Sequence, residues 1–119
     1  MQKNEEERDA VSQKIYSYIG LAQKAGKLAA GEFLTEKAIK EGKAELILLA
    51  EEASANTRKK FIDSGTYYSV PVYLLGSKEK LGHAMGKEFR ASAAVLDKGL
   101  AAAIMKQLAY LEHEDQRRR

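Results

Sequence analysis

The stretch AELILLA at positions 44–50 constrains the fold of this chain more than any other feature. It is almost wholly apolar, and a charged residue stands on each side of it. An apolar run of this length, rich in Ile and Leu, is typical of a β-strand that is buried on both faces. We therefore expect a strand inside a sheet that is covered on both sides, which favours an α/β fold.

Two more apolar runs predict further strands of the same sheet. VPVYLLG at 70–76 predicts a second buried strand, whose proline falls near the start, where strands tolerate it. SAAVL at 92–96 predicts a third, weaker strand, and a short extra strand is expected around 28–30.

Helical segments alternate with these strands. Apolar residues at helical spacing predict helices over 11–25, 32–41, 55–64, 78–85 and from 98 onward. The alternation of helices with short buried strands predicts a three-layer α/β/α sandwich around a central, largely parallel or mixed sheet.

Small polar residues and glycines mark the expected helix ends. Ser54, Ser77 and Asp97 are suited to cap the third, fourth and last helices, because their side-chain oxygens can accept free backbone N–H groups. Gly65 and Gly86 are expected to end the third and fourth helices.

The same spacing predicts which side chains face the core. In the second helix we expect Phe33, Leu34 and Ala38 to point inward, and in the third helix Phe61 and Ile62. The last helix carries an apolar stripe made of Leu100, Ile104, Leu108 and Leu111.

A chain of 119 residues fits one domain. We expect that single domain to span 9–112, with a flexible acidic tail at 1–8 and a charged tail at 113–119. The N-terminal residues are polar and no run approaches the length needed to cross a bilayer, so we expect neither a signal peptide nor a membrane partner. A cytoplasmic location fits a chain without cysteine.

Composition also excludes several kinds of chemistry. The absence of cysteine removes disulfides, thiolate catalysis and cysteine-based metal sites. His83 and His113 lack partners at zinc-ligand spacing, and the adjacent acids Glu51 and Glu52 are more typical of a solvated loop than of catalysis. No serine stands in a nucleophile elbow. We expect no enzyme activity, no metal and no cofactor.

The stretch LGHAMGKE resembles a phosphate-binding loop only superficially. Such a loop needs a glycine at its start and a hydroxyl after its lysine, so that backbone N–H groups hold phosphates and the hydroxyl reaches magnesium. Leu81 takes the place of the glycine, and Glu88 takes the place of the hydroxyl, where its carboxylate repels phosphate. Nucleotide hydrolysis is therefore excluded.

The basic residues favour an anionic partner. The net charge is +3, and the excess lies between 10 and 111, because the two ends together hold more acidic than basic residues. Gly31 precedes the second helix, whose first N–H groups and dipole attract anions, and Lys37 lies further along that helix. On spacing alone, an ordinary helix cap and an ordinary surface lysine are the favoured explanation.

Four stretches in order carry a resemblance to a known family. They are GLAQKAGKLAAGE, KAIKEGKAELILLAEEAS, YYSVPVYLLGSKEKLGHAMGKE and AAVLDKGLAAAI, which together span about 20–112. In this order they are similar to the kink-turn-binding ribosomal-protein family, and most closely to its small bacterial branch of YlxQ-type RNA-binding proteins. The ordered combination is much more specific than any single stretch.

The resemblance implies a fold and a function. It implies an α/β/α sandwich with a four-stranded mixed sheet, and non-catalytic binding of structured RNA, either kink-turn-like or ribosomal, with the ribosome as a possible site of action. In the family, the start of the second helix and the loop before the last strand grip a sharply bent RNA with sheared G·A pairs and an extruded nucleotide.

Placed on this sequence, the helix pattern G-x-N-E-x-x-K puts the glycine at Gly31 and the lysine at Lys37. Phe33 and Leu34 take the places of the Asn and the Glu, which is a departure, because a phenyl ring cannot hydrogen-bond a guanine edge. Glu32 is then the candidate for supplying a carboxylate nearby.

The remaining RNA-binding candidates lie on both sides of this helix. Ala29 and Ala30 replace the basic residues usual before the glycine, and Lys27 is the candidate to compensate. A possible phosphate track is extended by Arg58, Lys59 and Lys60. The loop before the last strand supplies Lys87, Glu88, Phe89 and Arg90. Phe89 is suited to stack under a flipped-out base, and Arg90 to contact phosphate or base.

Two other functions stay open on the sequence. One is a protein-interaction module that kept the fold and lost the RNA contacts, with Phe33 and Leu34 as an exposed apolar patch. Burial of both side chains would weaken that alternative. The other is the substrate-binding half of an RNA-modifying enzyme, which would need a separate catalytic partner.

Overall fold

The computed structural model describes residues 2–118, and the side chains of residues 5–112 within them. In this range the chain forms five helices and four strands. The helices are α1 (Gln2–Lys24), α2 (Glu32–Lys40), α3 (Ala55–Tyr68), α4 (Lys78–Ala84) and α5 (Lys98–Arg118). The strands are β1 (Leu28–Ala30), β2 (Leu46–Leu49), β3 (Val72–Leu74) and β4 (Ser92–Val95).

The four strands form one mixed sheet in the order β1-β4-β2-β3. β4 pairs antiparallel with both β1 and β2, and β2 pairs parallel with β3. Ile47 stands at the centre, opposite Ala94 on one side and Val72 on the other. The expected four-stranded mixed sheet is confirmed, and the weakest predicted strand, β4, lies inside it.

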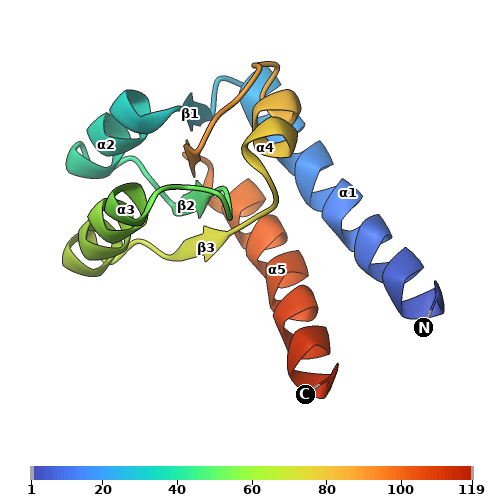
Figure 1. The fold of residues 1–119 in the computed structure, drawn as a ribbon. Coiled ribbons are helices and arrows are strands. Elements are labelled where there is room, and N and C mark those ends of the chain that lie inside the picture. The colour runs from blue at the N-terminus through green and yellow to red at the C-terminus, as the bar shows by residue number, and fades with distance from the viewer. Residues whose placement is uncertain (1, 119) are drawn as a thin grey trace.

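Helices cover both faces of the sheet, which confirms the three-layer sandwich. α2 and α3 lie together on one face, and α1, α4 and α5 lie on the other (Figure 1). Successive residues of β2 alternate between these layers: Ile47 and Leu49 pack under α2 and α3, while Leu46 and Leu48 pack against the other three helices. All four are fully buried, which is why the sequence of β2 is apolar without alternation.

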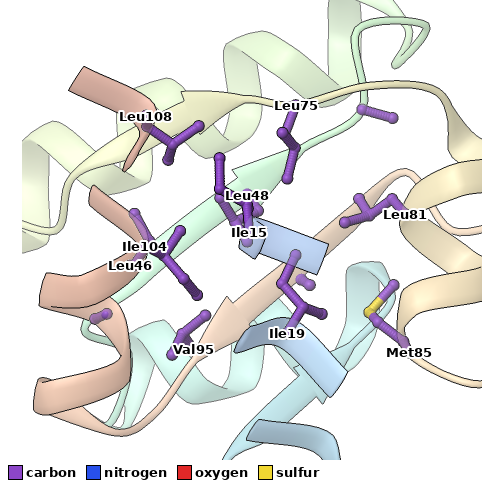
Figure 2. Packing of buried hydrophobic residues seen from close by; sticks show 13 residues of the cluster. Ile15, Ile19, Leu46, Leu48, Leu75, Leu81, Met85, Val95, Ile104 and Leu108 are labelled. Atoms are coloured by element: carbon purple, nitrogen blue, oxygen red, sulfur yellow. The ribbon is translucent and has the colours of Figure 1, made fainter. Parts of the chain in front are cut away.

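The larger of the two hydrophobic clusters lies under α1, α4 and α5. Figure 2 shows side chains from these helices and from β2 and β4 converging on one another. Ile15 and Ile19 come from α1, Leu81 from α4, and Ile104 and Leu108 from α5. The smaller cluster, on the opposite face, is centred on Phe61 of α3.

The predicted helix caps are confirmed. Ser54 accepts the backbone N–H of the residue three positions on, at 3.1 Å, and Ser77 does the same at 3.1 Å. Asp97 Oδ2 accepts the N–H of Leu100 at 2.8 Å. These bonds satisfy N–H groups that the first turn of each helix leaves free.

The prediction that 70–76 is a strand buried on both faces is wrong. β3 covers only three residues at the edge of the sheet, where Val72 and Tyr73 are half-buried and Leu74 is exposed. Leu75, immediately after the strand, does enter the core. An edge strand has a neighbour on one side only, so its side chains are less enclosed than those of β2.

The third helix also departs from expectation. It continues through Gly65 and ends at Ser69, which has a left-handed φ of 59°. Gly65 is buried because the chain entering β3 approaches it closely: a Cβ there would lie 2.7 Å from the carbonyl oxygen of Val70. Ile62, expected inward, is exposed.

The two end helices are longer than the apolar spacing predicted. α1 begins at Gln2 rather than near position 11, and α5 continues to Arg118. They run in opposite directions, and both chain ends lie at the same end of the molecule (Figure 1). The division of the chain into a domain at 9–112 and two tails stays a prediction. Within residues 2–118, no helix has both the length and the apolar character that a membrane crossing requires.

Candidate functional site

The beginning of α2 is an uncapped helix end. Gly31 is the N-cap residue, with φ 92° and ψ 168°, and no side chain caps the helix. The Gly31 N–H donates to the carbonyl oxygen of Ser92 at 2.9 Å, and the Gly31 carbonyl accepts from the N–H of Thr35 at 2.9 Å. The N–H groups between them have no helical partner and point out of the helix end. A φ of 92° favours glycine over any residue with a side chain.

Arg90 lies directly against this helix end. A Cβ built on Gly31 would be 3.6 Å from Cδ of Arg90 and 3.7 Å from its Nε. The Arg90 Nη1 donates to the carbonyl oxygen of Phe89 at 2.7 Å, which turns the side chain back along its own loop. The two segments expected to act together, 31–37 and 87–90, are therefore neighbours.

The loop of residues 87–90 rests on α4. The N–H of Lys87 donates to the carbonyl oxygen of Gly82 at 2.8 Å, and the N–H of Arg90 donates to that of Lys78 at 3.1 Å. A Cβ on Gly82 would overlap the carbonyl group of Glu88, so only glycine leaves room for the loop. Sequence reasoning missed this role of Gly82, because its place inside a predicted helix gives no sign of the loop that crosses it.

Phe33 and Leu34 point outward, and the prediction that they face the core is wrong. Phe33 is 77% exposed and Leu34 is 47% exposed. The buried residues of α2 are Thr35, Ala38 and Ile39. Because residues advance by about 100° around a helix, Phe33 lies nearly opposite Thr35.

The exposed face of α2 carries an aromatic and a cation together. Phe33 and Lys37 are four residues apart, so they lie on one side of the helix, and both are exposed. Across the contact with Arg90, Phe89 is 60% exposed. We call Phe33, Leu34 and Phe89 the aromatic surface.

Glu32 and Glu36 are held by a lysine of the neighbouring helix. Lys60 of α3 approaches Glu36 to 2.6 Å and Glu32 to 3.3 Å. The hydrogen bond from Lys60, followed by one from Lys40, lowers the pKa of the Glu36 carboxyl. The hydrogen bond to Glu36 raises the pKa of Lys60. The sequence offered Lys60 only as part of a possible phosphate track. Its pairing with Glu32 and Glu36 depends on how α2 and α3 pack together, which a run of basic residues does not show.

Other cations near the helix end are in no ion pair with the side chains that the structure describes. Among these described side chains, the lysines in ion pairs on α2, on α3 and just after α2 are Lys40, Lys59, Lys60 and Lys43. Lys37, Lys87 and Arg90 are not among the described ion pairs, so these three cations stand around the aromatic surface available to an anion.

The structure separates the two outlying candidates, Lys27 and Arg58. Lys27 precedes β1, at the opposite end of that strand from Gly31. Arg58 lies in the first turn of α3, which begins at the end of the sheet where Leu49 faces Ser92, the same end as Gly31. Arg58 therefore shares this end of the molecule with the loop, and Lys27 does not.

A groove with a volume of about 910 Å³ runs beside the loop, between α1 and α4. Tyr16, His83 and Phe89 are among its lining residues. Burial, and to a smaller extent the negative charge of Glu51, raise the pKa of Tyr16. Among the residues that the structure describes, no group of three or more His, Cys, Asp and Glu side chains is placed to hold a metal ion.

Comparison with known proteins identifies what this arrangement is similar to. Residues 13–105 match the model of the ribosomal protein L7Ae/L30e/S12e/Gadd45 family. The RNA-binding protein YlxQ of Bacillus subtilis is 42% identical over 93 residues, which are 78% of this chain and 93% of that protein. The protein of the same name from Enterococcus faecium is 42% identical over 89 residues, covering 75% and 85% of the two chains.

A solved structure shares the fold over most of its length. A Bacillus halodurans protein of unknown function superimposes with a TM-score of 0.78 at 33% sequence identity. The match covers 81% of this chain and 97% of the other.

Proposed function

This chain belongs to the ribosomal protein L7Ae/L30e/S12e/Gadd45 family, and on that premise we propose that it binds structured RNA without catalysing a reaction. The proposed contact surface is the first turn of α2 together with the loop of residues 87–90. The bound RNA is kink-turn-like or ribosomal, and the cytoplasm and its ribosomes are the proposed setting. Relatives named as RNA-binding proteins support the proposal.

One observation carries the proposal: the Arg90 side chain lies so close to Gly31 that a Cβ placed there would be in van der Waals contact with it. It joins a helix end with free N–H groups to a loop with cations, and each of these attracts phosphate. Gly31 has no Cβ, so an RNA backbone can approach this helix end closely. Lys37 and Lys87 stand on either side as further phosphate partners.

The proposal is tested by Lys37→Ala and Arg90→Ala. Each variant should bind a stem–internal loop–stem RNA with tandem G·A pairs more weakly than the parent protein. If each lost contact is one phosphate, the slope of log affinity against log salt falls by about 0.7 to 0.9 per variant. Filter binding over a series of salt concentrations measures both quantities.

Lys106→Ala is the matched control, because Lys106 is an exposed lysine of α5, on the face of the sheet opposite α2 and outside the proposed contact surface. It should leave affinity and slope near the parent values. Unchanged affinity and slope in both Lys37→Ala and Arg90→Ala would remove this surface from RNA binding.

The exposure of Phe33 and Leu34 favours a second candidate function, a protein-interaction module on the same fold. Exposed apolar side chains gathered at one place are suited to a protein partner. Crosslinking in cells distinguishes the two functions, since an RNA-binding module yields bound RNA. Recovery of protein partners with no RNA above background would establish the second candidate instead.

A further inference from the structure

We propose that Phe33 is a base-stacking platform, so that this surface selects folded RNAs presenting unpaired nucleotides in a bulge or internal loop. The inference rests on the proposed RNA-binding function and specifies its substrate class. Phe89 already offers one site for a flipped-out base, and Phe33 adds a second platform on the other side of the Gly31–Arg90 contact. Recognition then depends on unstacked bases and does not require sheared G·A pairs.

The distribution of phenylalanines in the molecule supports this assignment. The chain has three, and Phe61 is fully buried in the core. Phe33 and Phe89 are both largely exposed, and both lie beside the contact between Gly31 and Arg90. A phenyl ring has no polar group to place in water, so its exposure at one location is unfavourable unless a partner covers it.

The chemistry of the first turn of α2 excludes the alternative way of recognising a base. Neither Phe33 nor Leu34 has a hydrogen-bond donor or acceptor in its side chain, so neither can distinguish the edges of paired bases. The carboxylate of Glu32 is held by Lys60. A ring face can still contact a base, because every base has a π-face and stacking tolerates any sequence.

Each exposed ring has a cation near it in sequence. This arrangement suits a nucleotide, whose base can stack on the ring while its phosphate meets the cation. Lys37 lies one helical turn after Phe33 on the same face, and Arg90 follows Phe89 directly. Neither cation is in a described ion pair, so each is available to the phosphate of a nucleotide whose base rests on the neighbouring ring. An apolar protein segment would cover the rings and leave these two charges without a partner, which favours RNA as the occupant.

The test compares two hairpin RNAs that differ only in a two-nucleotide bulge, one of whose bases is 2-aminopurine. With one base on each ring, the parent protein should bind the bulged hairpin about a hundredfold more tightly than the fully paired one, since each stacked base contributes about tenfold. Binding should quench the 2-aminopurine fluorescence. Phe33→Leu should lose about tenfold in affinity for the bulged hairpin, lose the quenching, and leave affinity for the paired hairpin unchanged.

Two control variants separate the aromatic ring from apolar character and from aromatic content in general. Phe33→Tyr keeps the ring and should keep both affinity and quenching. Tyr67→Leu removes a ring that is exposed near the other end of α3 and should change neither. Because Phe33 and Tyr67 are both exposed, the thermal midpoint by circular dichroism should stay near the parent value in each of the three variants.

The outcomes distinguish this inference from the proposed function. If Phe33→Leu binds the bulged hairpin as the parent does and still quenches it, stacking on Phe33 is overturned while RNA binding stands. A bulged hairpin that is bound only when its stem contains G·A pairs also overturns the inference alone. If the parent binds neither hairpin nor G·A-containing RNA, both proposals fail, and the aromatic surface is assigned to a protein partner.

Discussion

Lys60 keeps two carboxylates away from the surface that is proposed to meet RNA. Its ammonium group bonds Glu36 at 2.6 Å and reaches Glu32 at 3.3 Å, drawing both acids toward α3. Glu32 lies in the first turn of α2, where an unpaired carboxylate would compete with phosphate for the free N–H groups. A single lysine on a neighbouring helix thus clears an anion site without contacting the anion.

Replacing Lys60 should be visible in the titration of Glu36. The hydrogen bond from Lys60 is the largest cause of the lowered pKa of Glu36, so Lys60→Met should raise this pKa toward its ordinary value near 4.5. A folded-state pKa below the unfolded value means that the interaction stabilises the protein above pH 4.5 and that this stabilisation is lost as pH falls through the folded-state pKa. Carboxyl-detected NMR titration of the two proteins measures the change.

Lys59→Met is the matched control for that titration. Lys59 is the preceding residue and pairs with Asp63 at 2.8 Å within α3, not with Glu36, so its loss should leave the pKa of Glu36 unaffected. Should Glu36 titrate identically in the parent protein and in Lys60→Met, Lys60 has no part in holding it. RNA affinity of Lys60→Met should fall, because Glu32 is then free to occupy the helix end.

Helix phase explains why the sequence predicted the position of α2 well and its inward face poorly. Phe33 and Leu34 are more apolar than Thr35, so the apolar spacing of the sequence predicted that these two side chains face the core. Thr35 is fully buried instead, with its hydroxyl 3.5 Å from the carbonyl oxygen of Ala29. The turn at Gly31, fixed by its bond to Ser92, sets the phase of the helix, and that bond joins strands distant in sequence.

At the scale of elements, α4 is a platform for the loop that follows it. The helix has seven residues, and the chain returns over it so closely that Gly82 touches the backbone of Glu88 and Phe89. Leu81 and Met85 anchor the other side of α4 in the core. The packing of the loop on α4 therefore helps to set the positions of Phe89 and Arg90.

Gly82→Ala should displace this loop. The added Cβ would overlap the Glu88 carbonyl and lie 3.0 Å from the N of Phe89, and neither is a flexible side-chain end. Overpacking of this kind lowers the free energy of unfolding by about 1 to 3 kcal/mol. Chemical denaturation measures the loss, and weaker binding of the bulged hairpin should accompany it.

Gly20→Ala is the matched control, since the same change occurs inside α1 where the nearest atom is the Ala84 carbonyl oxygen at 3.6 Å. Relief of glycine's helix penalty should stabilise that variant by about 0.5 to 1 kcal/mol. Equal stability and equal RNA affinity in Gly82→Ala and Gly20→Ala would contradict the assigned role of Gly82.

Local sequence signals largely predict the helices and strands, but they do not predict which segments pack beside one another. Caps at Ser54, Ser77 and Asp97 are contacts within three residues, and the sequence predicted them correctly. Gly65 was expected to end α3. A glycine is needed there because Val70 and Val72 pass close to it, and no local sequence pattern indicates that contact. The same holds for β3, because strand order decides which strand lies at the sheet edge.

At the scale of the whole molecule, β2 links the two hydrophobic clusters. Ile47 belongs to the cluster under α2 and α3, and Leu48 belongs to the cluster under α1, α4 and α5. Both side chains are fully buried, and they are consecutive residues of a strand inside the sheet. Damage to either layer therefore acts on the same four-residue strand.

Ile47→Ala and Leu48→Ala should each lower the free energy of unfolding by about 2 to 5 kcal/mol, as expected when a large core side chain is truncated. Each variant should still unfold in one cooperative transition, because the strand couples the layers. Far-ultraviolet circular dichroism and tyrosine fluorescence, followed together in urea, should give coincident curves. Separate midpoints for the two signals in either variant would show that the layers unfold independently.

The hydrogen bond from Gly31 to Ser92 has a kinetic consequence. Ser92 opens β4, and the loop of residues 87–90 runs directly into that strand, so both halves of the proposed RNA-contacting surface are attached to one buried β-strand. On the proposed function, an incoming RNA therefore meets two segments that the fold has already placed together. We expect association without a rearrangement of the protein, so that selectivity among RNAs lies in their dissociation rates.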